Sequence, residues 1–564
     1  MGGKEFLRSH HVTGAGWNTR HHRSLNETMT ATHHDVDPAG MPADGATPSP
    51  IPSDGLGRPA VAGLVAAAVA LGTTELVAGL LPSAPSLVVA IGNGVVELGA
   101  GSRVKEIAIA LFGTNEKTAL VIGTVVLALA FGAVLGVVGR RRSVAVASAG
   151  IGVFGLLGVA ATTVNPLDST AWSLVPAVLG VAAGVLTLRM LLRLDRGITG
   201  AAAGHPGVGR GRREFLRIAI GMAAVAGVIG AFGRTLSSRT RINDAREEVV
   251  LPEAVRTPAP VDLATEFEGI DGLSPFFTPN DAFYRIDTAL TPPMVDVDSW
   301  QVRIHGMVEQ EVVLTYQDLL DLPQVEADIT IACVSNEVGG DLIGTARWQG
   351  VRLSEVLDMA GVDPAADQLV GRSVDGWTAG FPTDIAFDGR DCLVALAMNG
   401  EPLPIAHGFP ARLIVPGLYG YVSATKWLSE IELTTWDAFD GYWVPRGWSK
   451  EGPVKTHSRI DVPKQGAPLE SGPQVIAGVA WAQQRGVERV EVSIDDGPWQ
   501  EAVLADELNV DTWRQWRFDW DAGPGQHVIR VRATDRTGVT QSAERVPVAP
   551  NGAEGYHTRA VTIA

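Results

Sequence analysis

The distribution of apolar segments constrains this chain of 564 residues more than any other feature of its sequence. Apolar stretches lie near 60–82, 118–139, 143–163 and 172–192, and a further one begins near residue 216. About 20 apolar residues suffice to cross the hydrocarbon core of a bilayer as a helix. We therefore predict a transmembrane region over 58–235 with five spans. The run at 84–113 is interrupted by Asn93, Glu97, Arg103, Lys105 and Glu106, and we expect it to be re-entrant or interfacial, with a sixth span as the alternative.

Charge divides the chain into two halves. The net charge is −17, and from Arg246 onward there are 48 acidic residues against 24 basic ones. A slightly basic apolar half followed by an acidic polar half predicts a membrane anchor that carries a globular domain. The acidic half would repel phosphate, which argues against binding to nucleic acid. Residues 1–57 are rich in His, Pro and Gly, and we predict a disordered cytoplasmic tail there rather than a metal site.

Arginines predict the orientation of the spans. Arg140, Arg141 and Arg142, together with a second cluster between Arg189 and Arg213, belong in the cytoplasm by the positive-inside rule. The segment 165–171 contains no Lys or Arg and fits the opposite side. We therefore expect a multi-pass protein of the plasma membrane whose chain after about residue 235 is extracytoplasmic.

Few residues are available to bind redox metals. No histidine occurs between Ala60 and Gly200, and the chain has only two cysteines, Cys333 and Cys392. Haem needs axial ligands, usually His, and iron–sulfur clusters need several thiolates. We expect neither haem nor an iron–sulfur cluster. The intramembrane carboxylates Glu75 and Glu97 are open to two interpretations, a plain anchor or a quinone or proton site.

The polar half is predicted to form two domains. Over 245–465, short alternating stretches mix with helical ones, such as an amphipathic helix near 352–360, which predicts an α+β domain. Over 472–564, alternation is repeated and is punctuated by turns at Asp495-Asp496-Gly497 and Gly523-Pro524-Gly525. Strands at this spacing predict an immunoglobulin-like β-sandwich.

Four segments resemble the sulfite oxidase family of molybdopterin enzymes. They read "TIACVSN", "GTARWQGVRLSEVL", "AMNGEPLPIAHGFPARLIVPGLYGYVSATKWL" and "NGAEGYHTRAVTI", in the order of that family. The resemblance implies a molybdopterin-binding oxidoreductase domain over 245–465 and a Mo-cofactor dimerisation domain over 472–564. The implied cofactor is a single-pterin molybdenum centre, and the implied chemistry is two-electron oxygen-atom transfer. Electrons would be exchanged with a separate partner, a cytochrome or a quinone-linked component, and the C-terminal domain would form a homodimer.

The resemblance also implies the site residues. A thiolate is a soft, strongly donating ligand, so Cys333 is expected to hold molybdenum, with Gly339-Gly340 letting backbone approach a bulky ligand. The terminal phosphate of the pterin calls for fixed cations. The expected cofactor-binding set is Phe277, Asn280, Asp281, Tyr284, Cys333, Asp375, His407, Arg412, Ser423, Ala424, Thr425 and Lys426, with Tyr442 as a catalytic tyrosine. The alternatives are a disulfide between Cys333 and Cys392, and a core role for the aromatic cluster around Tyr442.

The expected substrate is a small sulfur or related compound. Sulfite-oxidising relatives bind their anion with arginines, but Pro279 and Glu337-Val338 stand at the corresponding positions. Arg285 and Arg446 are candidates to replace them. A less cationic pocket favours a neutral S-oxide or N-oxide, as in the methionine-sulfoxide-reductase branch. A cofactor-free surface binding protein and a transporter with an extracellular domain are the alternatives from other classes.

An export signal lies inside the chain. The segment "GRREFLRIAIGMAAVAGVIGAFG" runs from Gly211 to Gly233 and begins like a twin-arginine signal, with the motif at 212–217. A cofactor inserted in the cytoplasm must cross the membrane in a folded domain, which is the task of the twin-arginine route. The alternative interpretation is an ordinary positive-inside cluster before a helix.

Overall fold

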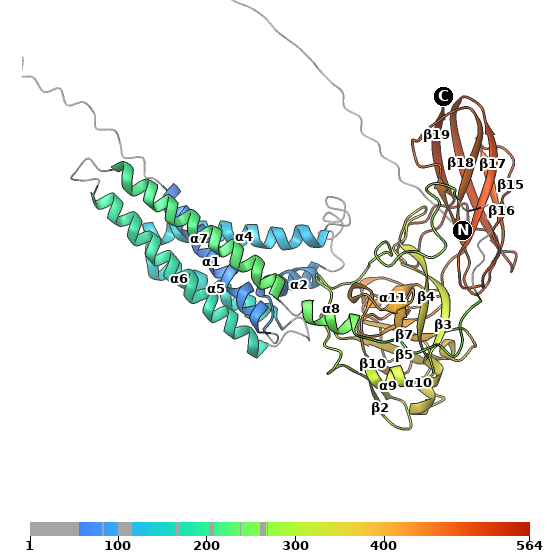
Figure 1. Ribbon diagram of the computed structural model, residues 1–564, viewed down its shortest axis with the longest axis horizontal. Coiled ribbons are helices and arrows are strands. Elements are labelled where there is room, and N and C mark those ends of the chain that lie inside the picture. The colour runs from blue at the N-terminus through green and yellow to red at the C-terminus, as the bar shows by residue number, and fades with distance from the viewer. Residues whose placement is uncertain are drawn as a thin grey trace, which may run out of the picture. The chain divides into compact units, whose positions relative to one another are not determined.

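We describe a computed structural model of the chain, over residues 56–81, 84–99, 116–163, 170–201, 208–236, 239–259, 267 and 269–564. The predicted N-terminal tail up to residue 55 lies outside the described residues, as do 100–115 and most of the loop 165–171. Helices α1, α2 and α4–α8 come first in the chain, and Figure 1 shows the long ones gathered in a bundle. Their bounds are α1 Gly57–Leu80, α2 Leu87–Gly99, α4 Glu116–Arg141, α5 Val144–Ala161, α6 Thr170–Ala201, α7 Val208–Leu236 and α8 Arg239–Glu247.

The prediction of five long apolar helices is confirmed. Segments long and apolar enough to span a membrane lie at Gly57–Leu80, Ala119–Arg141, Val144–Ala161, Thr170–Arg196 and Arg213–Gly233. Helix α2 has 13 residues, about 20 Å at 1.5 Å per residue, which is shorter than the ~30 Å hydrocarbon core. Helix α7 begins at Val208, so the arginine motif at 212–217 is helical rather than a lead-in to the helix.

Helix α1 packs closely against α4, α6 and α7. A side chain at Gly63 would lie 2.0 Å from the carbonyl oxygen of Gly132, and one at Gly136 would lie 2.0 Å from that of Pro59. On the α7 side, a side chain at Gly233 would lie 2.5 Å from the carbonyl oxygen of Glu75. Small residues let helix backbones approach closely, which drives helix association in lipid. The glycine-rich composition of these spans therefore has a packing function.

One buried carboxylate ties three helices together. Asp195 of α6 is 2% exposed and lies 3.2 Å from both Arg58 Nε of α1 and Arg140 Nε of α4. A buried charge is tolerated when it is paired. One of the positive-inside arginines, Arg140, thus neutralises an acid within the protein together with Arg58.

The middle domain is α+β, as predicted, and contains two sheets. One has the strand order β2-β1-β10-β5-β6, and the other has the order β3-β4-β7-β8 with β9 paired to β7. The strands are β1 Gln301–Gly306, β2 Val312–Thr315, β3 Val325–Ala332, β4 Ile343–Arg352, β5 Gln368–Ser373, β6 Thr378–Pro382, β7 Leu393–Met398, β8 Glu401–Pro402, β9 Arg412–Ile414 and β10 Leu428–Thr434. The short helices are α9 Tyr316–Asp321, α10 Leu353–Ala360, η2 Thr383–Ala386, η3 Ile405–His407, α11 Gly420–Ser423 and η4 Val444–Arg446.

The last domain is the predicted β-sandwich. Its sheets have the orders β11-β13-β17-β16 and β12-β19-β18-β14-β15. Their inward apolar side chains, such as Ile476, Trp516 and Val531, form a separate core. The strands are β11 His457–Val462, β12 Pro468–Leu469, β13 Gly472–Trp481, β14 Val487–Ile494, β15 Gln500–Glu501, β16 Val503–Leu504, β17 Arg514–Ala522, β18 Gly525–Asp535 and β19 His557–Ile563.

The sandwich holds strand β3 in place just before Cys333. The backbone N–H of Thr330 donates to the carbonyl of Asp511 (2.9 Å), and the N–H of Trp513 donates to Thr330 Oγ1 (2.8 Å). The indole of Trp513 donates to the carbonyl of Phe276 (2.9 Å). The C-terminal domain therefore fixes two segments of the α+β domain from one loop.

Candidate functional site

Cys333 lies at the end of β3, where the strand opens into a loop. Its N–H donates to the carbonyl of Leu342 (2.9 Å), and its carbonyl accepts from the N–H of Asn336 (3.0 Å). Asn336 Oδ1 accepts in turn from the N–H of Leu342 (2.9 Å). These bonds close the loop on itself, so the thiol, 7% exposed, has a fixed backbone beneath it.

The two glycines of this loop lie against other parts of the protein. Gly339 has a φ of +82°, which favours glycine, and a side chain there would clash with Nε2 of His557 in β19. A side chain at Gly340 would lie 2.5 Å from Asn336 Oδ1. Both glycines therefore allow close contacts with the sandwich and within the loop, and their expected role toward a ligand stays a prediction.

Arg412 and His407 form a buried polar pair. Arg412 is 3% exposed, donates from Nη1 to the carbonyl of His407 (3.0 Å) and stacks on Trp348 with its Cζ 5.1 Å from the ring centre. His407 donates from Nε2 to the carbonyl of Asn280 (3.0 Å). Burial, with Lys426 and Arg412 nearby, lowers the pKa of His407 to about 4, so its imidazole is neutral at pH 7.

Some buried polar atoms at this place have no partner within the described chain. Arg412 Nε, His407 Nδ1 and Thr425 Oγ1 are buried and make no hydrogen bond to any described residue. Buried polar groups are nearly always hydrogen-bonded, and leaving one unpaired costs about 1–3 kcal/mol. The three atoms on residues 407–425 are therefore available to hydrogen-bond water or a polar group from outside the chain.

Lys426 and Asp287 form an ion pair. Lys426 Nζ donates to Asp287 Oδ2 (3.1 Å) and to the carbonyl of Ala406 (3.1 Å). Arg285 Nε donates to the same Asp287 oxygen at 2.8 Å. Burial lowers the pKa of Lys426 to about 8, although Asp287 opposes the shift. Desolvation therefore leaves the ammonium charge of Lys426 poorly compensated.

A tyrosine and a second acid lie in the same pocket. Tyr284 is close enough to Cys333 and Arg412 for electrostatic interaction, and burial raises its pKa above the usual range. The phenol is therefore protonated at every physiological pH. Asp375 accepts from the N–H of Trp377 (3.1 Å), and burial raises its pKa.

Six of these residues line one pocket of about 690 Å³, whereas His407, Thr425 and Arg285 are not among its lining residues; the six are Tyr284, Asp287, Cys333, Asp375, Arg412 and Lys426. Two of its ionisable lining side chains are basic and two are carboxylates, so its formal charge is balanced. The other walls are mainly aromatic. The lining residues are Phe283, Tyr284, Ile286, Asp287, Thr288, Ile331, Cys333, Ser373, Asp375, Trp377, Arg412, Gly420, Tyr421, Ala424, Lys426, Trp427 and Trp443.

Several predicted site residues contact the pocket only indirectly. Asn280 supports His407 through its carbonyl, and its side chain bonds to Met398 and Glu401. Phe277 packs at the edge of the core, and Asp281 is exposed. Ser423 Oγ donates to the carbonyl of Tyr419 (3.1 Å).

Tyr442 does not line the pocket, whereas its neighbour Trp443 does. The Tyr442 ring lies under Arg446, with the guanidinium carbon 3.7 Å from the ring centre, and meets Trp443 edge-on at 5.1 Å. The two candidate replacement arginines, Arg285 and Arg446, are thus engaged with Asp287 and Tyr442. Glu337 is exposed and is not part of the pocket wall.

The sequence reasoning missed Asp287, Trp377 and Trp443. Asp287 lies three residues after Tyr284 and two after Arg285 in "FYRID". An acid this close in sequence to two candidate site residues was the available signal. Nothing local distinguishes Trp377 or Trp443, because their places depend on the packing of distant strands. Cys333 and Cys392, the only cysteines of the chain, are both described and are not joined by a disulfide, which corrects that alternative. Burial raises the pKa of Cys392 to about 12.

Comparison with known proteins gives consistent matches. Residues 289–443 match the family described as oxidoreductase molybdopterin binding domain. Human mitochondrial sulfite oxidase is 30% identical over 303 residues, which cover 45% of this chain and 55% of that protein. The uncharacterized oxidoreductase YuiH of Bacillus subtilis is 33% identical over 171 residues, which cover 30% of this chain and 83% of that protein. The sulfane dehydrogenase SoxCD of Paracoccus pantotrophus is 25% identical with a TM-score of 0.47, covering 51% of this chain and 82% of that one. The chain spans about half the length of the sulfite oxidases that it matches.

Proposed function

Because the chain belongs to the sulfite oxidase-like family of molybdopterin-binding oxidoreductases, we propose that it is a membrane-anchored enzyme that transfers an oxygen atom to or from a small sulfur or related compound. The observation that carries the proposal is the buried Cys333 thiol in a pocket with Arg412 and Lys426. The unpartnered atoms of His407, Arg412 and Thr425 support it further.

The residues fit a molybdenum–pterin cofactor. Cys333 supplies the single thiolate that a high-valent metal of this kind favours. Arg412 and Lys426 supply fixed positive charge for a phosphate, and the three unpartnered atoms supply a donor at Arg412, an acceptor at His407 and either at Thr425. Bound there, the cofactor would supply two-electron oxygen-atom transfer.

Side chains of the protein itself would determine which atoms of the site carry protons. His407 is held neutral, with its proton on Nε2 toward Asn280, so Nδ1 accepts. Tyr284 keeps its phenolic proton because burial disfavours the phenolate. Asp375 is the pocket carboxylate whose protonated form burial favours, which makes it a candidate proton donor. Tyr442 remains a proposed catalytic tyrosine, and it would act on substrate only from the rim beside Trp443.

The balanced charge of the pocket favours a neutral substrate. Asp287 offsets one of the two cations Lys426 and Arg412, and a bound phosphate would offset the other. Reduction of an S-oxide (R₂S=O + 2 e⁻ + 2 H⁺ → R₂S + H₂O) or of an N-oxide requires no binding site of net positive charge. Sulfite oxidation is the second candidate, because the sulfite oxidases are among the relatives of this chain.

The location of the enzyme is part of the proposal. The arginines at 140–142 and in the segment 189–213 favour an orientation with the start of α7 in the cytoplasm and its end outside. The α+β domain would then work on the extracytoplasmic side and pass electrons to a separate partner. The motif at 212–217 would direct the folded, cofactor-loaded domain through the twin-arginine route. A homodimer through the β-sandwich is proposed as well.

Molybdenum content tests the proposal. We expect near-stoichiometric molybdenum in the full-length protein from a host that makes the cofactor, and none in Cys333→Ala. Cys392→Ala is the matched control, because Cys392 is equally buried but lies outside the pocket, and it should keep the metal. Absence of molybdenum from folded wild-type protein would favour the cofactor-free binding protein instead. Loaded protein is then assayed with reduced viologen and methionine sulfoxide, and with ferricyanide and sulfite.

A further inference from the structure

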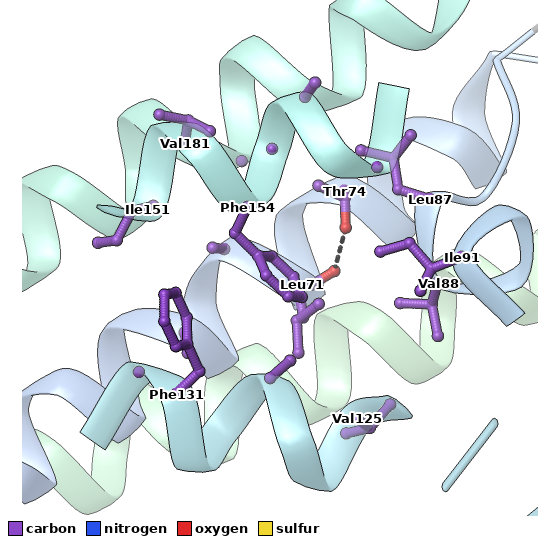
Figure 2. Close-up of a pocket in the computed structure, with 18 of the residues that line it drawn as sticks. Leu71, Thr74, Leu87, Val88, Ile91, Val125, Phe131, Ile151, Phe154 and Val181 are labelled. Atoms are coloured by element: carbon purple, nitrogen blue, oxygen red, sulfur yellow. Dashed lines mark hydrogen bonds between the residues drawn. The ribbon is translucent and has the colours of Figure 1, made fainter. Parts of the chain in front are cut away.

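A second pocket lies among the membrane helices. It measures about 680 Å³ and is bounded by α1, α2, α4, α5 and α6. Figure 2 shows the side chains of Leu71, Phe131 and Phe154 in its wall. None of its lining residues is charged. They are Ala67, Ala70, Leu71, Thr74, Leu87, Val88, Ile91, Thr124, Val125, Ala128, Phe131, Gly132, Leu135, Ile151, Phe154, Gly155, Gly158, Ala177, Gly180 and Val181.

The wall of this pocket is apolar and partly aromatic. Alanines and glycines supply much of the wall, which leaves space where other spans would place larger side chains. The rings of Phe131 and Phe154 are stacked with their centres 6.1 Å apart and present aromatic surface on one side. A neutral ring with an apolar tail, delivered from the bilayer, meets these conditions.

Polar groups occur beside one part of the pocket wall. Thr74 lines the pocket, and its hydroxyl donates to the carbonyl of Leu71 (2.7 Å; Figure 2). The next residue, Glu75, is 7% exposed, and its Oε1 accepts from the hydroxyl of Ser86 (2.7 Å), which directly precedes the lining residue Leu87. An ionisable group inside a membrane protein is costly and usually functional.

This polar part lies at one definite end of the bundle. A side chain at Gly233, in the last turn-and-a-half of α7, would touch the backbone of Glu75. The chain continues from the end of α7 toward the α+β domain. The opposite end of α1 is marked by the Arg58–Asp195 ion pair. The carboxylate therefore lies at the end of the bundle from which the oxidoreductase domain follows.

We propose that this pocket binds an isoprenoid quinone, with Glu75 and Ser86 exchanging protons at its polar end. The inference rests on the proposed function, which requires a two-electron partner when substrate is oxidised or reduced. The half-reaction balances as quinone + 2 e⁻ + 2 H⁺ ⇌ quinol, with the electrons exchanged with the oxidoreductase domain. Between Ala60 and Gly200 the sequence has neither His nor Cys to ligate a haem or an iron–sulfur cluster, so a diffusible lipid-soluble carrier fits this region.

Quinone binding to full-length protein in nanodiscs of synthetic phosphatidylcholine tests the proposal. The probes are decylubiquinone and menadione, and binding is measured by calorimetry. Val125→Trp fills the pocket, and its matched control is the neighbouring Val126→Trp, because Val126 is 56% exposed on the outer surface of the same helix. We expect saturable binding of at least one probe to wild type and to Val126→Trp, and a rise in Kd of at least tenfold in Val125→Trp. Ala128→Phe is the second filling variant, used if Val125→Trp unfolds.

The outcomes separate this proposal from the preceding one. Saturable binding that is weakened only by the filling variants supports the site whether or not the protein contains molybdenum. Absence of saturable binding, or equal loss in Val125→Trp and Val126→Trp, overturns the site. Retention of a phospholipid that neither probe displaces, seen by native mass spectrometry, overturns it as well. Molybdenum content and viologen-linked activity, measured on the same samples, report on the oxidoreductase proposal independently. Glu75→Gln should keep probe binding within threefold but slow electron transfer at least tenfold in loaded protein, measured as decylubiquinol oxidation by methionine sulfoxide and as decylubiquinone reduction by sulfite.

Discussion

The pocket among the membrane helices and the pocket beside Cys333 enclose nearly the same volume, about 680 and 690 Å³, but they are built from opposite chemistry. In the first, the space arises because small residues stand where helices converge, and the threonine hydroxyls of its wall bond to carbonyls of their own helices. The wall of the second contains Arg412, whose buried Nε has no partner within the described chain. An apolar pocket selects by shape and hydrophobicity, whereas a pocket with unpaired polar atoms selects by hydrogen bonding, which discriminates more strongly.

Disrupting the backbone contact between α1 and α4 should have the largest effect. Gly63→Leu would place a side chain where the Gly132 carbonyl and the Gly136 nitrogen already lie, at 2.0 and 2.6 Å, so the helices must separate. We expect loss of the compact bundle, seen as rapid proteolysis between spans and aggregation in detergent. Gly123→Leu on α4 is the control, since nothing lies within 4 Å of that position. Equal behaviour of the two variants would contradict the packing described for α1.

Removing the buried guanidinium should affect only the polar pocket. Arg412→Gln deletes a guanidinium that is 3% exposed and would hydrogen-bond the cofactor, and a hydrogen bond to a charged group is worth about 1.5–3 kcal/mol. We expect cofactor retention to fall about tenfold or more, measured as molybdenum per chain after dialysis. Arg372→Gln is the control, because Arg372 pairs with Glu432 on a partly exposed sheet face. Unchanged molybdenum in Arg412→Gln would remove this residue from the site.

Acid should destabilise the α+β domain and the β-sandwich and leave the membrane helices unchanged. His557 packs on the loop after Cys333, and its Nδ1 accepts from the N–H of Ile460 (2.9 Å). Burial, with Arg559, Arg459 and Arg545 nearby and opposed by Asp461, lowers its pKa to about 4. The unfolded chain, with a pKa near 6.5, therefore binds more protons between pH 6.5 and 4. The contribution of His557 to stability is complete above pH 6.5 and is lost as the pH falls through this window, by up to ~3 kcal/mol at 1.36 kcal/mol per pKa unit.

The measurement is the free energy of unfolding of the soluble half in urea, followed by tryptophan fluorescence between pH 7.5 and 4. His557→Gln keeps an acceptor without the titration, so its stability should fall less steeply with pH. An unchanged slope would show that His557 is not the titrating group. The described membrane helices contain no histidine, so their helical circular dichroism should be constant across the same range.

Local pattern explains what the sequence could predict. Each element that the sequence predicted depends on neighbours within about 20 residues, as span lengths and strand alternation do. The structure confirms the five long apolar helices, the α+β domain and the sandwich. The family was evident because its motifs, the segment around Cys333 and the "HGFPAR" segment, are each a short continuous stretch of sequence.

Long-range contacts explain what it could not predict. Asp287 reaches Lys426 across 139 positions, and the ring of His557 meets Gly339 from another domain. Arg140, one of the positive-inside arginines, and Arg58 both pair with Asp195, which hydropathy alone does not indicate. No periodicity encodes such pairs, because each depends on how separate elements pack.

The position of α1 at the centre of its neighbours has a consequence for biogenesis. Its partners α4 and α6 are synthesised soon after it, but α7 emerges last, some 130 residues after the end of α1. The glycine face of α1 that receives α7, at Gly72 and Gly79, must therefore remain open to lipid until the final helix arrives. The order of synthesis makes α7 the last helix to join the bundle, and the α+β domain follows it directly in the chain.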